Sequence, residues 1–389
     1  MSKHTLVQKV PKGREYMRQT CIVVALIFLC VSMFPSYTYA QINETSARNV
    51  ILMEQHSGRV LYAKQEHNQE KIASITKIMT ALLAVESGKL QDTVSISNNA
   101  VRVEGSAIYL KPGQKVPLED LVYGLMLRSG NDAAQAIAEH VGGSMEGFVY
   151  LMNEKAKEIG MKNTHFSNPH GLDGDGEHYS SAYDMALLTR YAMNYKEFRK
   201  IFGTKSYQSK AWDYPWKNKH KLVTFKYEYA TGGKTGFTKK AGRTLVTTAS
   251  KDGLDLIVVT IHASSDWNDH MYLFNEGFKR YKETMVLKKG ALSGVEEQNY
   301  VNHVYTKNSL LLPLAEDERD EVTLGIEFDK TAKLKDGEKV GRAVLYLDGK
   351  ELGERNIFYS KQKLVATTGL FWTDFKEVFS HMLGVGTDG

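Results

Sequence analysis

The hydrophobic pattern divides the chain into four stretches. Residues 21–34 form an almost unbroken apolar run, and from there to about Tyr281 segments of strand period alternate with segments of helical period. Beyond Lys288-Lys289-Gly290 the period is that of strands, and from Leu370 apolar residues return at helical spacing. We therefore predict four parts: a signal peptide at 1–40, a main domain at 41–284, a β-rich domain at 285–367 and an amphipathic tail at 368–389.

The main domain mixes helices with antiparallel strands. The apolar stretches 49–53 and 59–63 flank the turn His56-Ser57-Gly58 and predict a hairpin. A helix is expected from about Ser74 to Gly88, because apolar residues recur there every three or four positions. Further helices are predicted at 118–127, 132–141, 148–160 and 182–193, and strands at 244–249 and 254–261. This order predicts an α/β fold, more strictly α+β, with helices packed on an antiparallel sheet.

Residues 1–40 have the three parts of a secretory signal. A basic stretch precedes the apolar run, and the small residues of Thr38-Tyr39-Ala40 follow it. The run of 14 residues is short for a membrane-spanning helix, which needs roughly twenty. We expect cleavage after Ala40 and hence an extracytoplasmic protein, with an uncleaved membrane anchor as the alternative. Both cysteines, Cys21 and Cys30, leave with this segment, so no disulfide chemistry is expected afterwards.

The charge of the chain argues against nucleic acid as a partner. The whole chain has a net charge of +5, but residues 1–40 hold five basic residues and one acidic residue, which leaves about +1 after cleavage. A nearly neutral protein lacks the basic surface that phosphate binding needs.

The stretch Ser74-Ile75-Thr76-Lys77 stands at the start of the first predicted helix. Side chains three positions apart share a helix face, so the Lys77 amine can reach the Ser74 hydroxyl. A serine hydroxyl attacks a carbonyl when a base accepts its proton, and lysine is that base once burial or a neighbouring cation lowers its pKa. Alone, the pattern also fits an ordinary helix start with a solvent-facing lysine.

Two further patterns carry matching chemistry. Ser129-Gly130-Asn131 lies between two predicted helices, where a hydroxyl and an amide face the same side of a loop; the alternative is a simple helix N-cap. Lys234-Thr235-Gly236 precedes two predicted strands and supplies a positive charge, a hydroxyl and a backbone that a substrate can approach closely. Lys234 placed near Lys77 would also lower the Lys77 pKa.

A metal site is not expected. His170, Asp173, Asp175 and His178 lie close together in the sequence, but their spacing matches no metal-binding signature and the stretch is rich in turn residues. We therefore predict a structural loop there, and no cofactor.

The three patterns together resemble the serine acyl-transfer set of penicillin-binding proteins and serine β-lactamases. From Val50 to Tyr281 the sequence is similar to the low-molecular-mass penicillin-binding proteins that are D-alanyl-D-alanine carboxypeptidases. Its stretches 72–80, 125–134 and 168–172 resemble the sporulation-type enzyme of endospore-forming bacteria. The resemblance implies a β-lactamase/transpeptidase-like catalytic domain at 41–284 and a function in peptidoglycan synthesis.

The resemblance also implies a mechanism. Ser74 would attack the carbonyl between the last two D-alanines of a peptidoglycan stem pentapeptide, while Lys77 accepts its proton. D-alanine would leave with a proton relayed through Ser129, and water would then hydrolyse the acyl-enzyme. β-Lactam antibiotics would acylate the same serine.

Other residues would hold the substrate by the same resemblance. Asn131 would align the peptide, and Lys234 and Thr235 would bind its terminal carboxylate beside Gly236. The backbone N–H groups of the nucleophile and of Phe237 would form the oxyanion hole.

One position departs from the family pattern. Some members carry an arginine upstream of the Lys-Thr-Gly strand, and that arginine binds the substrate carboxylate. This chain has Asn218-Lys219-His220 there, and Lys219 offers the charge without the bidentate fork of arginine.

Two alternative functions share these residues. A serine β-lactamase of the class A type adds a glutamate in a Glu-x-x-Leu-Asn stretch, and none lies between Asn131 and Lys234. Lactamase types that lack this glutamate remain open, and so does a β-lactam-sensing or wall-binding module that acylates without turnover.

The two C-terminal parts carry no catalytic pattern of their own. Strands are predicted at 300–305, 322–328 and 343–347, and the resemblance implies a module that spaces the catalytic domain from the membrane or contacts partners. In the tail, apolar residues from Leu370 at helical spacing, together with Trp372, predict a helix that lies in a membrane surface. The alternative is a helix packed on the β-rich domain.

Overall fold

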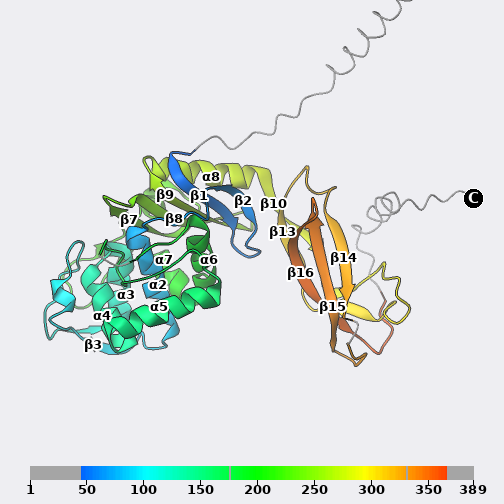
Figure 1. The fold of residues 1–389 in the computed structure, drawn as a ribbon, viewed down its shortest axis with the longest axis horizontal. Helices are drawn as coiled ribbons and strands as arrows, with labels where there is room; N and C mark the ends of the chain where they lie inside the picture. The colour runs from blue at the N-terminus through cyan, green and yellow to red at the C-terminus, as the bar shows by residue number, and fades with distance from the viewer. Residues whose placement is uncertain (1–44, 175–176, 330–331, 366–389) are drawn as a thin grey trace, which may run out of the picture. The chain divides into compact units, whose positions relative to one another are not determined.

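The computed structural model of the protein describes residues 45–174, 177–329 and 332–365 (Figure 1). The predicted signal peptide at 1–40 and the predicted tail helix at 368–389 lie outside the described residues. Both therefore stay predictions, as do the boundaries between the four parts.

A five-stranded antiparallel sheet forms the centre of the main domain, in the order β2-β1-β9-β8-β7. The predicted hairpin is present, with Ile51 paired to Ala63, and so is the β8–β9 hairpin around Asp252-Gly253. The two strands β2 and β7 form the sheet edges. The strands are β1 (Ala47–Glu54), β2 (Val60–Lys64), β7 (Ala230–Thr238), β8 (Gly242–Lys251) and β9 (Leu254–Ala263).

Helices cover both faces of this sheet. Helix α8 (Asp266–Arg280) lies on one face against β1, β8 and β9, while α6 (Ala182–Ala192) packs on the opposite face with the other helices behind it (Figure 1). These others are α2 (Lys77–Glu86), α3 (Leu118–Tyr123), α4 (Asn131–Gly142), α5 (Met145–Ile159) and α7 (Lys196–Phe202). Short elements complete the domain: η1 (Ala73–Thr76), η2 (Ala100–Arg102), η3 (Gly124–Arg128), η4 (Leu222–Lys226), β3 (Thr93–Ser95), β4 (Lys115–Pro117), β5 (Ser206–Tyr207) and β6 (Trp216–Lys217).

The side chains of the central strands alternate between two apolar layers, as the period of a strand requires. Ile51 and Met53 belong to the large hydrophobic core that α2 to α7 share. Leu52 points the other way, where it faces Gly277 of α8. Because both layers are closed, the strands are nearly continuous runs of buried residues, and the sheet is a rigid base for the residues at its edge.

Helix α2 is buried almost completely. The helix predicted from about Ser74 begins with a turn that is not α-helical. Residues 73–76 form the 3₁₀ turn η1, which leads directly into α2 at Lys77. Nine of the ten residues of α2 are buried. The polar side chains among them, Lys77 and Thr80, must therefore form hydrogen bonds inside the protein.

The predicted helix at 118–127 is continuous, but it changes from an α-helix to a π-helix. It begins as α3 and ends as the π-helix η3, after which Ser129 adopts a left-handed conformation with φ of 64°. Wide π turns inside helices are frequent at functional sites, because they redirect the chain that follows.

The C-terminal region is β-rich, as predicted. Strands β11 (Gly290–Ala291), β12 (Val304–Thr306), β14 (Thr323–Phe328), β15 (Lys339–Leu347) and β16 (Lys350–Tyr359) form a sheet in the order β11-β12-β16-β15-β14. Strands β10 (Tyr281–Leu287) and β13 (Leu310–Ala315) pair with each other. Buried Leu, Val and Ile residues of these strands form a hydrophobic core of their own.

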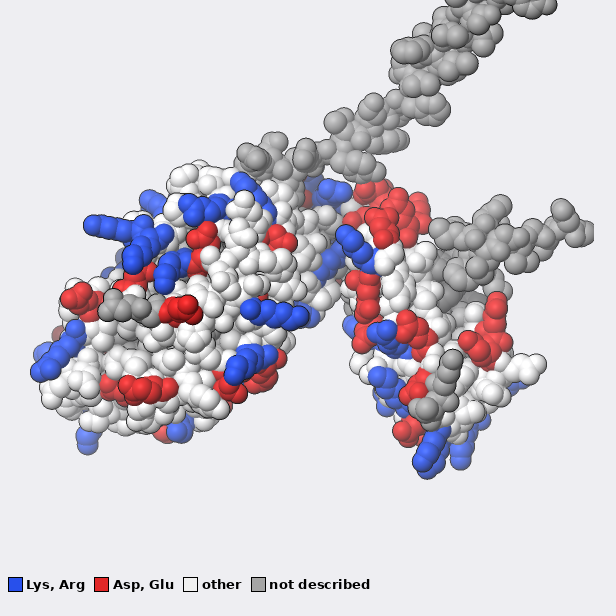
Figure 2. Space-filling model, viewed as in Figure 1, with Lys and Arg blue, Asp and Glu red and all other residues white. Residues whose placement is uncertain are grey.

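The charged surface is mixed. Figure 2 shows Lys and Arg interspersed with Asp and Glu over the visible face, in keeping with the nearly balanced counts of the sequence. No helix in the described part of the chain has the length and apolar character to cross a membrane.

Candidate active site

The first two predicted residues meet at the junction of η1 and α2. Ser74 lies in η1 and Lys77 is the first residue of α2, and Lys77 Nζ is 2.8 Å from Ser74 Oγ. Lys77 is completely buried, whereas Ser74 is partly exposed and so is accessible to a substrate. The alternative of a solvent-facing lysine is therefore wrong.

The Lys77 amine has two further contacts. Its nitrogen also lies 2.8 Å from Asn131 Oδ1 and 2.6 Å from the carbonyl oxygen of His170. Both of these oxygens only accept hydrogen bonds, so they take two N–H bonds of a neutral amine. The lone pair that remains faces the Ser74 hydroxyl, which is the arrangement of a general base and its nucleophile.

The surroundings of Lys77 favour the neutral amine. Burial lowers its pKa well below the ordinary value, and the positive charges of Lys234 and Lys219 lower it further. The negative charge of Asp132 raises the Lys77 pKa, but this is the smallest of the four effects. The Asp132 carboxylate accepts hydrogen bonds from the backbone N–H of Ile108. These surroundings favour the neutral form of Lys77 that a general base requires.

Ser129 and Lys234 come together beside this pair. Lys234 Nζ donates to Ser129 Oγ over 3.1 Å and to the carbonyl oxygen of Thr235 over 2.7 Å. Lys234 is buried, and burial together with the charge of Lys219 lowers its pKa to about 7. The left-handed backbone of Ser129 after η3 aims its hydroxyl at Lys234 instead of capping a helix.

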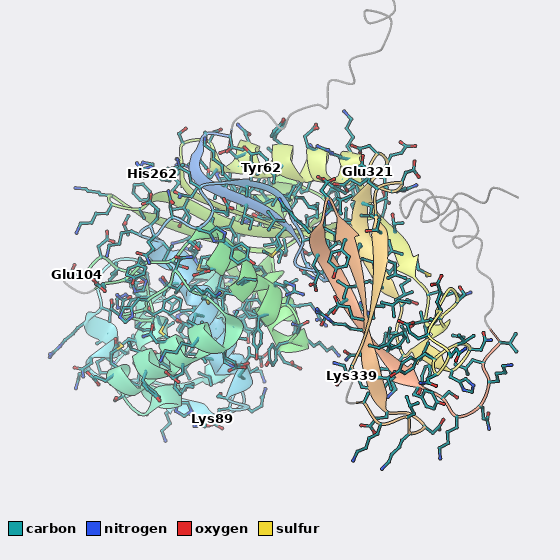
Figure 3. All side chains as sticks on the ribbon, turned by 45° about the vertical axis from the view of Figure 1, so that its right-hand side comes forward. Tyr62, Lys89, Glu104, His262, Glu321 and Lys339 are labelled. Atoms are coloured by element: carbon teal, nitrogen blue, oxygen red, sulfur yellow. The ribbon has the colours of Figure 1, made fainter. Side chains whose placement is uncertain are left out.

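Asn131 is held in one orientation from both ends. Its Nδ2 donates to the carbonyl oxygen of Glu104 over 2.6 Å, in the loop that Figure 3 labels at Glu104, and its Oδ1 accepts from Lys77. Asn131 is the first residue of α4, its side chain makes no capping bond, and Gly130 occupies the N-cap. The N-cap alternative for this motif is therefore wrong.

Lys234, Thr235 and Gly236 lie on β7, the strand at the sheet edge. The backbone of β7 contacts η1, so the open side of the strand lies next to the nucleophile. A Cβ atom at Gly236 would lie 2.9 Å from the backbone nitrogen of Ser74 and 2.3 Å from Thr244 Oγ1. Only glycine permits this close approach. The side chain of Phe237 is 68% exposed at the end of the motif.

Lys219 lies near the same group. Its Nζ donates to Ser106 Oγ over 3.2 Å, and its backbone N–H donates to the carbonyl oxygen of Leu127, at the end of η3. Lys219 is exposed, but partial desolvation together with the charge of Arg128 lowers its pKa. The structure thus brings three lysines, Lys77, Lys219 and Lys234, to one site.

Sequence analysis missed two contributions of the backbone. The carbonyl of His170 binds Lys77, and Ala73 has a positive φ of 49°, which is unusual for a residue with a Cβ. Such strain costs about 1 kcal/mol or more and is concentrated at functional sites. Neither could be found from side-chain types, because any residue supplies a carbonyl and alanine carries no sign of strain.

No group of His, Cys, Asp and Glu side chains in residues 45–174, 177–329 and 332–365 is arranged to hold a metal ion. His170 and His178 instead belong to the loop that packs against η1, where the His170 ring accepts from the backbone of Leu172. A serine hydroxyl in contact with a buried lysine amine, with two further lysines nearby, is an arrangement that suits acyl transfer from a substrate that carries a carboxylate.

Comparison with known families matches both regions of the chain. Residues 36–265 match the D-alanyl-D-alanine carboxypeptidase family, and residues 272–366 match the family described as the C-terminal domain of penicillin-binding protein 5.

Individual relatives match most of the chain. The D-alanyl-D-alanine carboxypeptidase DacF of Bacillus subtilis is 33% identical over 358 residues, which cover 85% of this chain and 91% of DacF. The D-alanyl-D-alanine carboxypeptidase DacC of Escherichia coli is 32% identical over 354 residues, 85% of this chain and 88% of DacC.

Solved structures agree with this. Penicillin-binding protein 5 from Haemophilus influenzae superposes with a TM-score of 0.71 at 29% identity, covering 82% of this chain and 97% of that structure. The D-alanyl-D-alanine carboxypeptidase DacD from Francisella tularensis gives a TM-score of 0.67 at 27% identity, over 87% and 98% of the two chains.

Proposed function

The chain belongs to the D-alanyl-D-alanine carboxypeptidase family, and from that premise we propose how its residues remove the terminal D-alanine from a peptidoglycan stem pentapeptide. It is a serine-type hydrolase with the fold of the penicillin-binding proteins. The observation that carries the proposal is the contact of the buried Lys77 amine with Ser74 Oγ.

In the acylation step, Ser74 Oγ attacks the carbonyl carbon of the penultimate D-alanine. The proton of the hydroxyl passes to the lone pair of Lys77, whose two N–H bonds are held by Asn131 and the His170 carbonyl. The new Oγ–C bond makes a tetrahedral intermediate, and its oxyanion lies between the backbone N–H groups of Ser74 and Phe237.

In the second half of acylation, the C–N bond breaks and D-alanine leaves. Its nitrogen needs a proton, which Ser129 supplies while it regains one from the Lys77–Lys234 side of the site. The hydrogen bond from Lys234 Nζ to Ser129 Oγ supports this route. Water then attacks the ester with Lys77 again as the base, and Ser74 recovers its proton as the shortened peptide leaves.

The terminal carboxylate of the substrate is bound by positive charge. Lys234, Lys219 and the hydroxyl of Thr235 are the groups that we assign to it, since an ionised acceptor strengthens each hydrogen bond. The bound carboxylate in turn raises the pKa of Lys234 from about 7, which keeps this lysine protonated during turnover. Asn131 aligns the peptide, and Gly236 allows its backbone to approach β7.

β-Lactams fit the same site as covalent inhibitors. Their ring amide is attacked by Ser74 as the peptide would be, but the opened ring stays attached to the acyl group and no fragment departs. We infer that the adduct is long-lived, which distinguishes this enzyme from a β-lactamase, where water removes the adduct rapidly.

The experiment that tests the function is D-alanine release from a diacyl-Lys-D-Ala-D-Ala tripeptide. We expect release by the mature protein and a loss on the order of 10⁵-fold in kcat/KM with Ser74→Ala. Mass spectrometry after benzylpenicillin treatment should add one antibiotic to the wild type and none to Ser74→Ala. Acylation by penicillin without any D-alanine release would contradict the carboxypeptidase and favour the sensor, whereas rapid penicillin turnover would favour the β-lactamase.

We also propose that the enzyme is exported and works at the outer face of the cytoplasmic membrane. The signal pattern of residues 1–40 supports export, and the amphipathic pattern of 368–389 supports attachment. Deleting 368–389 should move the enzyme from the membrane fraction to the soluble fraction without loss of kcat. An unchanged distribution between the two fractions would show that the tail is not the anchor.

We assign the enzyme to sporulating cells on the likeness of its stretches 72–80, 125–134 and 168–172 to the sporulation-type enzyme. Immunoblots of the host through growth and sporulation should detect the protein only after sporulation begins. Equal amounts in growing cells would contradict this assignment and leave the enzymatic function unaffected.

A further inference from the structure

We propose that Thr76 and His178 position the oxyanion-binding N–H of Ser74, and that they do so by holding the carbonyl group of Ala73. The inference rests on the proposed function, in which the Ser74 N–H stabilises the developing oxyanion. Neither Thr76 nor His178 is a catalytic residue, because they act through the backbone and not on the substrate.

The argument begins with the peptide unit between Ala73 and Ser74. A peptide group is planar and trans, and the described residues contain no cis bond, so the Ala73 C=O and the Ser74 N–H point in opposite directions. Any contact that fixes the carbonyl therefore fixes the direction of the N–H. The positive φ of Ala73, 49°, means that the local backbone does not favour this orientation by itself.

The two ends of this peptide unit face different parts of the protein. On the carbonyl side, a Cβ atom at Gly171 would lie only 1.9 Å from the Ala73 oxygen, so the loop backbone passes directly beside it. On the nitrogen side, the Cβ position of Gly236 lies 2.9 Å from the Ser74 nitrogen. The N–H is thus on the side of β7, where the substrate carbonyl is expected.

Thr76 supplies the hydrogen bond that holds the carbonyl. Its Oγ1 donates to the Ala73 oxygen over 2.8 Å, and its side chain is completely buried. A threonine hydroxyl that bonds to a carbonyl three residues earlier is common in helices, so this bond alone does not indicate a function.

His178 makes the arrangement specific. The backbone N–H of Ser167 donates to His178 Nδ1 over 3.1 Å, so the neutral ring carries its hydrogen on Nε2, which donates to Thr76 Oγ1 over 2.8 Å. The Thr76 hydroxyl already accepts from His178, and its own hydrogen is directed at the Ala73 oxygen. Burial keeps the ring neutral, since it lowers the His178 pKa to about 3. A residue 102 positions away thus fixes the direction of a hydrogen bond next to the nucleophile.

The test compares Thr76→Val with Thr76→Ser and with a control, Thr189→Val. Thr189 is equally buried, and its hydroxyl also donates to a backbone carbonyl, that of Met185, but it lies in α6 and contributes nothing to the site. The readouts are kcat and KM for D-alanine release, the rate constant of acylation by benzylpenicillin and the melting temperature.

We expect Thr76→Val to lower kcat and the acylation rate constant by about tenfold or more at nearly unchanged KM, because one oxyanion donor can be worth a hundredfold. Thr76→Ser keeps the hydroxyl and should restore most of the rate. Thr189→Val should lower the melting temperature by about as much as Thr76→Val does, but leave kcat unchanged. Equal kcat for the Thr76→Val and Thr189→Val variants would overturn the proposal.

His178→Leu covers the case in which Thr76→Val does not fold. This variant keeps the Thr76 hydroxyl but removes the contact that directs its hydrogen at the Ala73 oxygen. We therefore expect kcat to fall, but by less than in Thr76→Val. An unchanged kcat in a folded His178→Leu variant would equally overturn the proposal. Failure of the proposed function has a separate signature, which is a wild-type protein that neither releases D-alanine nor is acylated at Ser74.

Discussion

Lys219 adds to the effect of burial on the pKa of the other two lysines of the site. Its positive charge lowers the pKa of Lys77 and of Lys234, although it touches neither in the contacts described above. If Lys219 binds the substrate carboxylate as we propose, it supplies a positive charge without the bidentate fork that an arginine would add.

Lys219→Met should move both limbs of the pH profile to higher pH. The acid limb follows Lys77, which must lose its proton to act as base; without the charge of Lys219 its pKa rises, so activity is lost at a higher pH on acidification. The alkaline limb follows Lys234, whose pKa of about 7 in the free enzyme also rises. KM should increase about tenfold for the loss of one charge-assisted hydrogen bond.

The measurement is kcat/KM for D-alanine release between pH 5 and 10. Lys219→Arg should keep the limbs in place and lower KM, and the exposed Lys221→Met is the matched charge control. Identical profiles for the Lys219→Met and Lys221→Met variants would disprove this role.

Sequence patterns were sufficient for the side chains of the site but not for its backbone groups. The structure brings together the five predicted side chains, those of Ser74, Lys77, Ser129, Asn131 and Lys234. They could be predicted because the functional group of a side chain is known from the sequence alone. Their individual roles in turnover stay predictions. The His170 carbonyl and the strain at Ala73 have no counterpart in residue type, so only the folded backbone shows them.

At the scale of elements, the joint between α4 and α5 depends on two adjacent glycines for two different reasons. A Cβ at Gly142 would lie 2.5 Å from the backbone nitrogen of Phe148, in the first turns of α5. Gly143 has open space around it but a φ of 74°, which residues with a Cβ adopt only at a cost.

Gly142→Ala should therefore destabilise the protein more than Gly143→Ala. Steric overlap with backbone forces α5 away from α4 and should cost about 3 kcal/mol, near the upper end for overpacking. The left-handed strain at residue 143 should cost about 1 kcal/mol. Urea unfolding of both variants gives the free energies, and the reverse order would show that the joint adjusts easily to an added methyl group.

Periodicity predicted many of the helices and strands, but not all of them. The helices α4, α5 and α6 and the strands β8 and β9 lie within a few residues of their predicted positions. Helix α8 was not predicted, because its buried face includes Asp266, Asp269 and His270 beside Leu273, Phe274 and Phe278. The change from α3 to the π-helix η3 does not alter the spacing of apolar residues, so periodicity cannot detect it.

At the scale of the whole molecule, three buried histidines make stability sensitive to acid. His178, His220 and His270 are each at most 2% exposed, and burial lowers their pKa, to about 3 for the first two. His178 and His220 are therefore neutral in the folded protein at pH 5, and the lowered pKa of His270 acts in the same direction. In the unfolded chain all three bind protons below about pH 6.5.

The free energy of unfolding should therefore fall as the pH is lowered from about 6.5 towards 4. Each proton taken up only by the unfolded chain contributes a slope of about 1.4 kcal/mol per pH unit. His170, whose pKa burial also lowers to about 3, acts in the same direction, whereas His56, whose pKa Asp255 raises, acts in the opposite direction. Urea unfolding at pH 7.5, 6 and 5 measures the slope, and His178→Leu should make it shallower by one proton. A stability that is constant from pH 7.5 to 5 would contradict the prediction.

The position of β7 at the sheet edge has a consequence for aggregation. A strand that leaves one side open for a substrate backbone offers the same side to the edge strand of another molecule, and exposed edges of this kind promote aggregation. In this chain the open strand contains Gly232, Gly233 and Gly236, residues with little tendency to form intermolecular sheets, and η1 covers part of its length. Gly236, which we propose admits the substrate backbone, would therefore also discourage this edge from pairing with another copy of the protein.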